Sequence, residues 1–335
     1  MATYYGTYGQ KVQYLASDPS DPQIGQVWYN STSAVLKVRS ATTTGTFASG
    51  GTMATARQLL ASAGTQTAAL GFGGTAPYTG QTESYNGTSW TTLPASLNTA
   101  RAYLAGCGTQ TSALGATGYN AGFPTATETY DGTSWTSVNS VSTARAKPGI
   151  SGVQTAALIF GGSSPFPGGT GVRSISESWN GTSWTSAPSI NTARFQAGSS
   201  GTQTAALMFA GSVSSPVAGT TNTNATESYN GTSWTTLPAT LPFSNRVFTG
   251  NGTMTQTSAV ATGGGPPESA TTAVWNGTTW TANPTSLSTN RNRGGVAGDT
   301  ANTLFFAGST PGGNLANTEE FTGPGTATTK TVTVS

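Results

Sequence analysis

The sequence contains no histidine, a single cysteine and few charged residues. Of its 335 residues, 7% are charged, whereas soluble domains average about 25%. Without histidine, the chain lacks the base of a Ser-His-Asp triad and the commonest protein ligand of zinc, iron and copper. The lone cysteine, Cys107, excludes an intrachain disulfide, and we predict that it is a small buried residue.

Signals for nucleic acid and membranes are also weak. The formal net charge of +2 does not provide the basic surface that nucleic acid or anionic lipid attracts. No run approaches the roughly 20 apolar residues of a membrane span. The first residues lack the basic and apolar regions of a secretory signal peptide. We therefore expect no nucleic-acid partner, no membrane partner and synthesis in a cytoplasm.

The chain instead repeats one short phrase five times. Its second copy reads Glu128-Thr-Tyr-Asp-Gly-Thr-Ser-Trp135. The tryptophans that close the five copies are 45, 49, 50 and 46 residues apart. A repeat of this length predicts a propeller or a solenoid. The five tryptophans are Trp90, Trp135, Trp184, Trp234 and Trp280.

One repeat, residues 101–145, divides into four short strands. Apolar and small residues fill the first two, and Asp131-Gly132 is a hairpin turn between the last two. Four strands in about 45 residues predict a propeller blade. An arginine opens each repeat, and counting these arginines predicts six blades. We expect the sixth blade to end in degenerate form, with its last strand at 330–334. The arginines are Arg57, Arg101, Arg145, Arg194, Arg246 and Arg291.

These features together resemble kelch repeats. The resemblance lies in a double glycine ending the second strand, an aromatic residue in the third, a tryptophan in the fourth and an arginine opening the next blade. It covers residues 48–335. It implies an all-β protein whose residues 48–335 form a six-bladed kelch-like β-propeller. We expect residues 1–47 to form a separate N-terminal segment that contains a short β-hairpin.

The recurring residues are best explained by the fold. We predict that each tryptophan packs between neighbouring blades. The repeat arginine and the glutamate of the third strand recur together, which predicts pairs or backbone hydrogen bonds that hold blade to blade. A carboxylate pair for glycoside hydrolysis would have to come from the remaining acids. We expect no enzyme activity, no cofactor and no metal. The remaining acids are Asp18, Asp21, Asp131, Glu268, Asp299 and Glu319.

The connections between the second and third strands differ from blade to blade. In a propeller they share one face with the connections that lead to the next blade, and the short uniform turns share the other. Variable loops on a rigid scaffold are common binding sites, although surface loops also vary without a function. We predict ligand binding on this face, and the candidate residues are Tyr78, Tyr119, Phe123, Phe166, Arg173 and Glu268.

The N-terminal segment does not follow the blade pattern. Its phrase from Gly25 to Val38, Gly-Gln-Val-Trp-Tyr-Asn-Ser-Thr followed by Leu-Lys-Val, reads as a separate hairpin. The phrase resembles a module at the start of tailed-bacteriophage fibre and appendage proteins. The resemblance implies attachment to other virion proteins through residues 1–47, with Trp28, Tyr29 and Leu36 as candidate attachment residues. The alternative is that the segment supplies an extra strand or a cover for the propeller edge.

These expectations combine into one leading hypothesis. The chain is a non-enzymatic bacteriophage virion protein, oligomeric in its assembly, that displays a propeller on the tail or capsid. The propeller binds a host-surface glycan or another virion protein. Two alternatives remain open: a bacterial kelch-type interaction module or carbohydrate-binding protein, and a hydrolase or lyase built on a propeller.

Overall fold

The computed structural model describes residues 12–20, 22, 25–41, 44–75, 77–164, 171–214, 221–244, 254–265, 267–324 and 327–332. Every regular element in these ranges is a β-strand. None of the described residues forms a helix of the length and apolar character needed to span a membrane. The chain divides into two compact units, of which one comprises Met1–Thr46 with Thr322–Ser335 and the other Phe47–Phe321.

The smaller unit contains one four-stranded sheet, in the order β1-β2-β3-β29. Strand β1 runs parallel to β2, and the other neighbours are antiparallel. The hairpin expected in this segment is β2–β3, in which Tyr29 lies opposite Leu36. The strands are β1 (Gln13–Leu15), β2 (Val27–Asn30), β3 (Val35–Ala41) and β29 (Ala327–Val332).

Asp18 fixes one side of this sheet. Its carboxylate accepts hydrogen bonds from Trp28 Nε1 at 3.0 Å, Asn30 Nδ2 at 2.7 Å and Lys37 Nζ at 2.6 Å. The bond from Lys37, with those from Asn30 and Trp28, lowers the pKa of Asp18 to about 2. The turn-rich stretch that contains Asp18 is therefore tied to both strands of the hairpin. Trp28 is fully buried against it.

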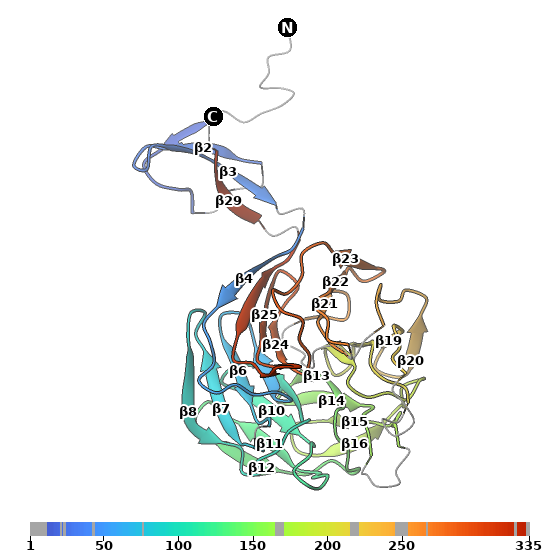
Figure 1. Cartoon of the computed structure of the whole chain (residues 1–335). Helices are drawn as coiled ribbons and strands as arrows, with labels where there is room; N and C mark the ends of the chain where they lie inside the picture. Colours follow the sequence, from blue (N-terminus) through green and yellow to red (C-terminus); the bar gives the residue numbers. More distant parts are fainter. Residues whose placement is uncertain are drawn as a thin grey trace. The chain divides into compact units, whose positions relative to one another are not determined.

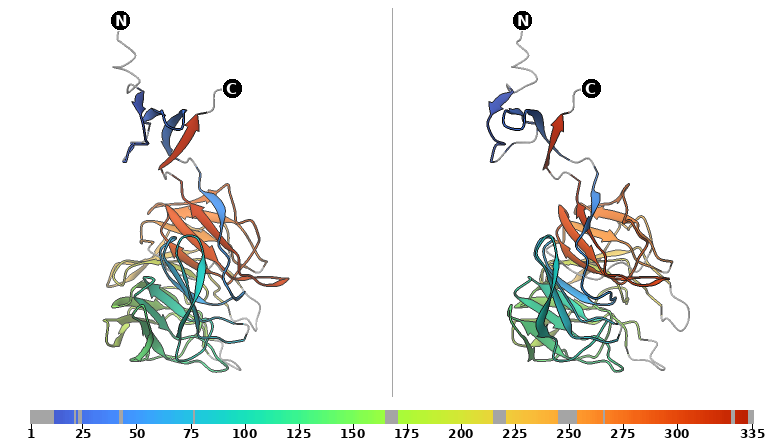
Figure 2. Two further views of the ribbon diagram at one scale, coloured as in Figure 1. Left: turned by 90° about the vertical axis from the view of Figure 1, so that its left-hand side faces the viewer. Right: turned by 60° about the vertical axis from the view of Figure 1, so that its left-hand side comes forward.

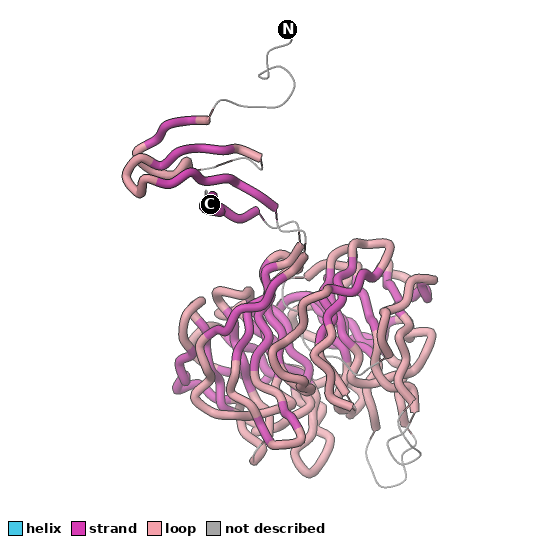
Figure 3. The backbone as a smooth tube through the Cα atoms, turned by 45° about the horizontal axis from the view of Figure 1, so that its top comes forward, coloured by secondary structure: helices cyan, strands magenta, loops and turns pink. Residues whose placement is uncertain are grey.

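The larger unit contains six sheets among its described residues, together with the two-stranded hairpin β26–β27 (Figures 1 and 3). Five sheets have four strands, and the fifth along the chain has three described strands. The first sheet has β5 (Ala61–Gly64), β6 (Ala69–Phe72), β7 (Gln81–Tyr85) and β8 (Trp90–Ser96). The second has β9 (Ala105–Gly108), β10 (Ala113–Ala116), β11 (Thr127–Tyr130) and β12 (Trp135–Val138). The third has β13 (Gly149–Val153), β14 (Ala156–Phe160), β15 (Ser176–Trp179) and β16 (Trp184–Ala187).

The remaining sheets continue the same pattern. The fourth has β17 (Gly198–Gly201), β18 (Ala206–Phe209), β19 (Thr226–Tyr229) and β20 (Trp234–Leu237), and the fifth has β21 (Ala259–Thr262), β22 (Thr272–Trp275) and β23 (Trp280–Asn283). The sixth has β24 (Gly295–Gly298), β25 (Asn302–Phe306), β28 (Thr318–Thr322) and β4 (Thr46–Gly50), and the hairpin is β26 (Ser309–Thr310) with β27 (Gly313–Asn314). First strands of successive sheets lie side by side, as β5 does with β9 and β9 with β13, and β24 lies beside β5.

The end of the chain is placed differently from the sequence-based expectation. The expected last strand of the sixth blade is β29, which pairs with β3 in the smaller unit. The sixth sheet is completed instead by β4, which precedes the first repeat. An unpaired outer strand would leave an open sheet edge, and β4 pairs with that edge. Strand β4 crosses the expected boundary at residue 47 and lies mostly in the range expected for the propeller, whereas β2 and β3 form a separate sheet.

Glutamines join five of the six sheets to the neighbouring sheet, and between the fifth and the sixth the hydroxyl oxygens of Ser258 and Thr300 lie 2.5 Å apart. Gln110 lies in the turn between the first two strands of its sheet, and its Nε2 donates to the carbonyls of Ala69 and Tyr85 in the preceding sheet, at 3.1 and 2.6 Å. Gln66 of the first sheet makes the same contacts with Thr303 and Phe321 of the last. Because β24 of the last sheet also lies beside β5 of the first, the sheets close into a ring. Figure 2 shows the orange and red strands of the last repeats next to the blue and cyan strands of the first. The other members of this set are Gln154, Gln203 and Gln256.

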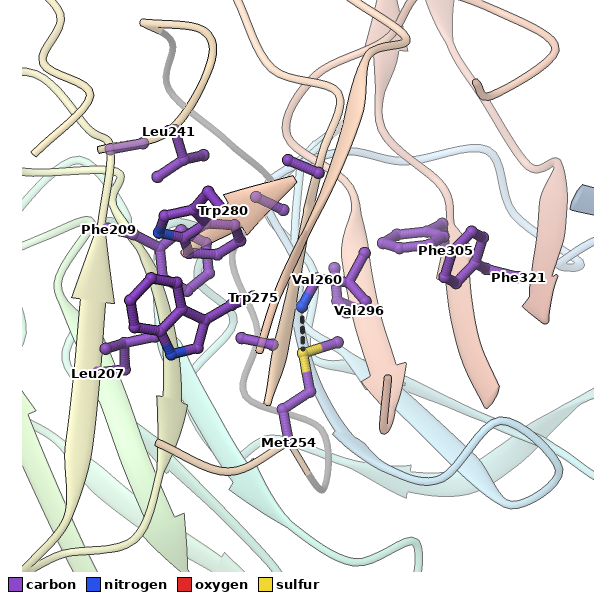
Figure 4. Packing of buried hydrophobic residues seen from close by; sticks show 14 of the residues in the cluster. Leu207, Phe209, Leu241, Met254, Val260, Trp275, Trp280, Val296, Phe305 and Phe321 are labelled. Carbon is purple, nitrogen blue, oxygen red and sulfur yellow. Dashed lines mark hydrogen bonds between the residues drawn. The ribbon is translucent and has the colours of Figure 1, made fainter. Parts of the chain in front are cut away.

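The repeat tryptophans fill the space between sheets. Trp280 of β23 packs on Phe209 of the neighbouring β18, with ring centroids 4.8 Å apart, and on Trp275 of its own sheet (Figure 4). Its Nε1 donates to Thr226 Oγ1, again in the neighbouring sheet. Trp90, Trp135 and Trp184 make the equivalent hydrogen bond to a threonine. Each tryptophan thus combines a large buried area with a satisfied N–H group.

Candidate functional site

Buried ion pairs fix the connections that enter each blade. Arg101 lies just before β9, and its guanidinium pairs with Glu128 in the third strand of the same sheet, with both side chains fully buried. The other oxygen of Glu128 accepts the backbone N–H of Asn98 at 2.6 Å. The glutamate therefore holds the incoming connection at two points. The same arrangement recurs in Arg57–Glu83, Arg145–Glu177, Arg194–Glu227 and Arg291–Glu319, while Arg246 lies outside the described residues.

The pair in the last sheet departs from what the sequence suggests. Glu319, counted among the acids outside the repeat pattern, is the partner of Arg291. The next residue, Glu320, accepts a hydrogen bond from the Tyr85 hydroxyl at 2.6 Å. Burial, helped by this bond, raises the pKa of Tyr85 to about 12. Burial also lowers the pKa of Arg145 to about 10, against the opposing effect of Glu177.

The residue two positions after each arginine has a left-handed backbone. These residues are Leu59, Tyr103, Lys147, Gln196 and Arg293, with φ between 50° and 62°. Four of the five backbone N–H groups donate to the carbonyl of the equivalent residue one repeat away, and three of these bonds join successive blades: Tyr103 to Leu59 at 2.9 Å, Lys147 to Tyr103 at 2.9 Å and Gln196 to Lys147 at 3.0 Å. Leu59 donates to Arg293 at 2.8 Å, which connects the first repeat to the last. We call these five residues the axial ring.

The axial ring surrounds a small cavity. All five of its residues line this space of about 20 Å³, together with Leu104 and Pro148. Because five different repeats contribute to it, the cavity marks the place where the blades meet. It lies on the face that carries the variable connections, since each ring residue follows the connection that enters its blade.

A larger pocket adjoins the ring between the second and third blades. It has a volume of about 190 Å³ and is lined by Tyr103, Tyr119, Phe123, Ala146, Lys147 and Ser163. We call this space the aromatic pocket. Backbone hydrogen bonds of 2.7 and 2.9 Å tie Tyr119 to Ala102, next to Tyr103. The matching bonds between Ala146 and Ser163 place the opposite wall.

The side chains of the pocket hold one another in position. The Tyr119 and Phe123 rings meet edge to face with centroids 5.1 Å apart, and Tyr78 contacts Tyr119 in the same way at 5.7 Å. Lys147 Nζ lies 4.5 Å from the centroid of Tyr103 and 5.2 Å from that of Phe195. Cation–π contacts of this kind attract an ammonium group to an aromatic face. The pocket therefore has aromatic walls with one positive charge at its inner end.

The structure groups only some of the predicted ligand-binding residues. Tyr119 and Phe123 line the aromatic pocket and Tyr78 contacts it, whereas Phe166 lies outside the described residues. Arg173 is half-buried, and its charge acts on Arg145. Glu268 accepts a hydrogen bond from Asn292 Nδ2 at 3.1 Å. Neither Arg173 nor Glu268 is among the residues that line the pocket.

Sequence reasoning missed Tyr103, Lys147 and Arg293. A signal was present, because each stands two residues after a repeat arginine in a segment that otherwise repeats. The position reads Leu, Tyr, Lys, Gln and Arg in the five described copies. Variation of the side chain at a position whose backbone geometry repeats is therefore the signal that marks these residues.

The opposite face carries a different cavity. It has a volume of about 380 Å³ and is lined by the turns between first and second strands, including Gly108, Thr109, Gly152 and Thr202. Val153 is its one half-exposed aliphatic residue among the described ones. Elsewhere in the described residues, no three acidic, cysteine or histidine side chains gather as metal ligands. Cys107 is fully buried in β9, and burial raises its pKa to about 12.

Comparison with known proteins identifies the fold of the larger unit. No protein-family model matches the chain, and no curated protein matches it. A solved structure titled "Structure of YjhT" is similar, with a TM-score of 0.67 and 14% sequence identity, over 84% of this chain and 99% of that one. The larger unit is a β-propeller. At this identity the likeness shows the fold alone, and propellers host many unrelated functions; kelch membership and the count of six blades stay predictions.

Proposed function

We propose that this chain is a non-enzymatic structural protein of a bacteriophage virion whose propeller recognises a host-surface saccharide. The observation that carries the proposal is the aromatic pocket on the variable-loop face. Tyr103, Tyr119 and Phe123 surround a space of about 190 Å³. Aromatic rings bury the apolar C–H faces of sugar rings, and the rest of a pocket of this kind needs few polar groups.

The scaffold behind the pocket supports a binding role. Ligand sites need walls that keep their shape before the ligand arrives. Here Arg101 and Arg145, just before Tyr103 and Lys147, are locked in buried ion pairs. The pocket walls are also cross-linked by backbone bonds between blades. Little conformational entropy is therefore lost when a ligand binds.

The state of the carboxylates favours binding over hydrolysis. Five of the propeller's glutamates are paired with arginines. Asp131 and Asp299 accept hydrogen bonds from their own turns. A glycoside hydrolase needs two carboxyl groups facing the same bond, and these acids are each engaged elsewhere. Our proposal is accordingly a recognition module.

The smaller unit supports attachment to other virion proteins. Tyr14 is 76% exposed and stacks on Tyr29, with ring centroids 4.9 Å apart. Tyr29 lies opposite Leu36, which in turn lies opposite the half-exposed Val332. Tyr29 and Leu36 are half-buried, so the strip is partly exposed, and an apolar strip that reaches the surface is typical of protein–protein contacts. It includes Tyr29 and Leu36, two of the three attachment candidates, whereas Trp28 is buried against Asp18.

Two measurements test the proposal. The full chain is applied to an array of bacterial surface saccharides, where we expect binding that falls at least tenfold in Tyr119→Ala and Phe123→Ala. Thr136→Ala, an exposed residue of β12, is the control and should bind like the unchanged protein. Absence of binding to any saccharide would refute the recognition role. Immuno-electron microscopy of phage particles tests the virion assignment, and unlabelled particles would refute it.

A further inference from the structure

The aromatic pocket and the axial cavity share a wall. Tyr103 and Lys147 line both spaces. Tyr103 closes the pocket on its inner side, and Lys147 stands above its ring at 4.5 Å. A ligand that fills the pocket therefore reaches the axial ring with whatever group it carries at that end. The two spaces can be treated as one site with a wide aromatic part and a narrow inner part.

The side chains of the axial ring are retained at an energetic cost. A left-handed backbone costs about 1–2 kcal/mol for a residue other than glycine. Where the second strand ends, the chain meets the same demand with glycine or a small residue, as at Gly161, Thr117 and Ala210. In the axial ring the corresponding residues are Leu, Tyr, Lys, Gln and Arg. Strain of this kind is concentrated at functional sites, so the large side chains call for a role beyond the backbone ring.

The narrow part presents hydrogen-bond donors and positive charge. Its polar lining consists of Lys147, Arg293, Gln196 and the Tyr103 side chain, and none of its described lining residues is acidic. Arg293 is held in place by a bond from its Nη1 to Gln58 Oε1 at 3.1 Å. A volume of about 20 Å³ accommodates one small group, since a single water needs roughly 10–15 Å³ on the same measure.

Charges elsewhere in the propeller reinforce this polarity. Asp131 and Asp299 lie in turns of the opposite face. On the variable-loop face, Lys147, Arg173 and Arg293 stand outside the buried glutamate pairs, and the acid described there is Glu268. An anionic ligand would therefore be attracted to the face that carries the pocket.

We infer that the site binds an acidic saccharide, with a sugar ring in the aromatic pocket and its carboxylate in the axial cavity between Lys147 and Arg293. The inference rests on the proposed saccharide recognition and adds the ligand class. A carboxylate is small, planar and an acceptor only, which matches a lining of donors. Arginine offers it two parallel N–H groups, and lysine adds a second charge.

The test compares one saccharide with and without its charge. The strongest uronic-acid-containing binder from the array is carboxyl-reduced, which converts each uronic acid into the neutral hexose. By isothermal titration of the full chain, we expect the acidic form to bind at least tenfold more tightly in low salt. The advantage should shrink as salt rises, because screening weakens the attraction. Equal affinities for the two forms would overturn the inference.

Variants separate the two parts of the site. Lys147→Gln and Arg293→Gln should abolish the preference for the acidic form. Because Arg293 does not line the aromatic pocket, Arg293→Gln should also leave binding of the reduced form within twofold. Tyr119→Ala should weaken both forms. Arg39→Gln, which removes a positive charge from the smaller unit, is the matched control and should change neither.

The array also distinguishes the two proposals. Binding of neutral saccharides alone, or of sulfated and phosphorylated ones without uronic acids, would overturn the carboxylate inference and leave saccharide recognition standing. No binding of any class would overturn both.

Discussion

The two faces of the propeller use repetition in opposite ways. On the face with the short turns, both backbone and side chains repeat: Asn180 Oδ1 accepts the N–H groups of Thr182 and Ser183 at 3.0 and 2.9 Å. Asn86, Asp131, Asn230 and Asn276 do the same in their turns. On the other face the axial ring repeats its backbone geometry and varies its side chains.

This difference separates structural from functional residues. A side chain that bonds its own turn serves the fold, and it recurs in the five sheets whose third and fourth strands are joined by this turn. At a position where the backbone alone makes the repeating bond, the side chain is free to differ. The variable chemistry of Tyr103, Lys147 and Arg293 is therefore compatible with a constant scaffold. The comparison predicts that substitutions on the two faces have different consequences.

The largest loss of stability is expected when a buried arginine–glutamate pair is broken, because these pairs hold the backbone that carries the variable face. Glu128→Ala leaves the Arg101 guanidinium buried without its charged partner, which costs about 3–5 kcal/mol of unfolding free energy. Denaturant unfolding measures the loss. Combining the change with Arg101→Met should recover much of it, because no unpaired charge remains. A loss below about 1 kcal/mol for Glu128→Ala would show that the pair does not hold the blade.

An intermediate change in stability is expected when glycine and alanine are exchanged at a left-handed position on each face. At Lys147, with φ 59°, the glycine variant should be more stable than the alanine variant by about 1 kcal/mol, because only alanine retains the left-handed strain. Both variants lose the same lysine, so the difference isolates the backbone. Thermal or denaturant unfolding of the two variants measures it.

The counterpart on the other face is Gly132, with φ 95°. Its nearest neighbour to an added Cβ is Thr111 O at 3.4 Å, so Gly132→Ala should lose about 1–2 kcal/mol through backbone strain rather than a clash. If the alanine variant at position 147 proved as stable as the glycine variant, the strain assigned to the axial ring would be wrong.

The smallest effect is a pH dependence of stability in the turn that has Asp131, where the four equivalent turns have asparagine. Hydrogen bonds from the Thr133 hydroxyl and the N–H groups of Ser134 and Thr133 lower the pKa of Asp131 to about 2, from the usual 3.8. Because the folded value is the lower one, the carboxylate stabilises the turn above about pH 4, and this contribution disappears as the pH falls through 2.

Asp131→Asn should therefore keep the turn and flatten the pH dependence of unfolding between pH 4 and 2. Unfolding curves of the two proteins at several pH values in this window test it. An identical pH profile for both would contradict the role given to Asp131.

Much of the propeller can be predicted from the sequence because the same local interactions recur in each repeat. The Asp131-Gly132 turn, the strands around it and the association of arginine with glutamate follow from local chemistry and spacing. The glutamine contacts were missed, since Gln110 in a polar turn resembles any solvent-exposed turn residue. The exchange of β4 and β29 was missed as well, because strand pairing between residues hundreds of positions apart leaves no local pattern.

The candidate site was predicted in part for the same reason. Tyr78, Tyr119 and Phe123 stand out as aromatic residues in loops that do not repeat, and the structure brings them together. Tyr103 and Lys147 lie within the repeat itself, and only the curvature of the ring places them beside those loops. Arg173 and Glu268 have the same loop character but lie outside the pocket lining.

The all-β class, the repeat, its hairpin turns and the recurring residues of the blades can be predicted from local sequence, because they depend on contacts between neighbours along the chain. The strand that completes the last sheet, the contact of the first repeat with the last and the side chains around the axis become known only from the folded chain. The closure of the ring brings residues together that are far apart in the chain, and local sequence patterns do not predict such contacts.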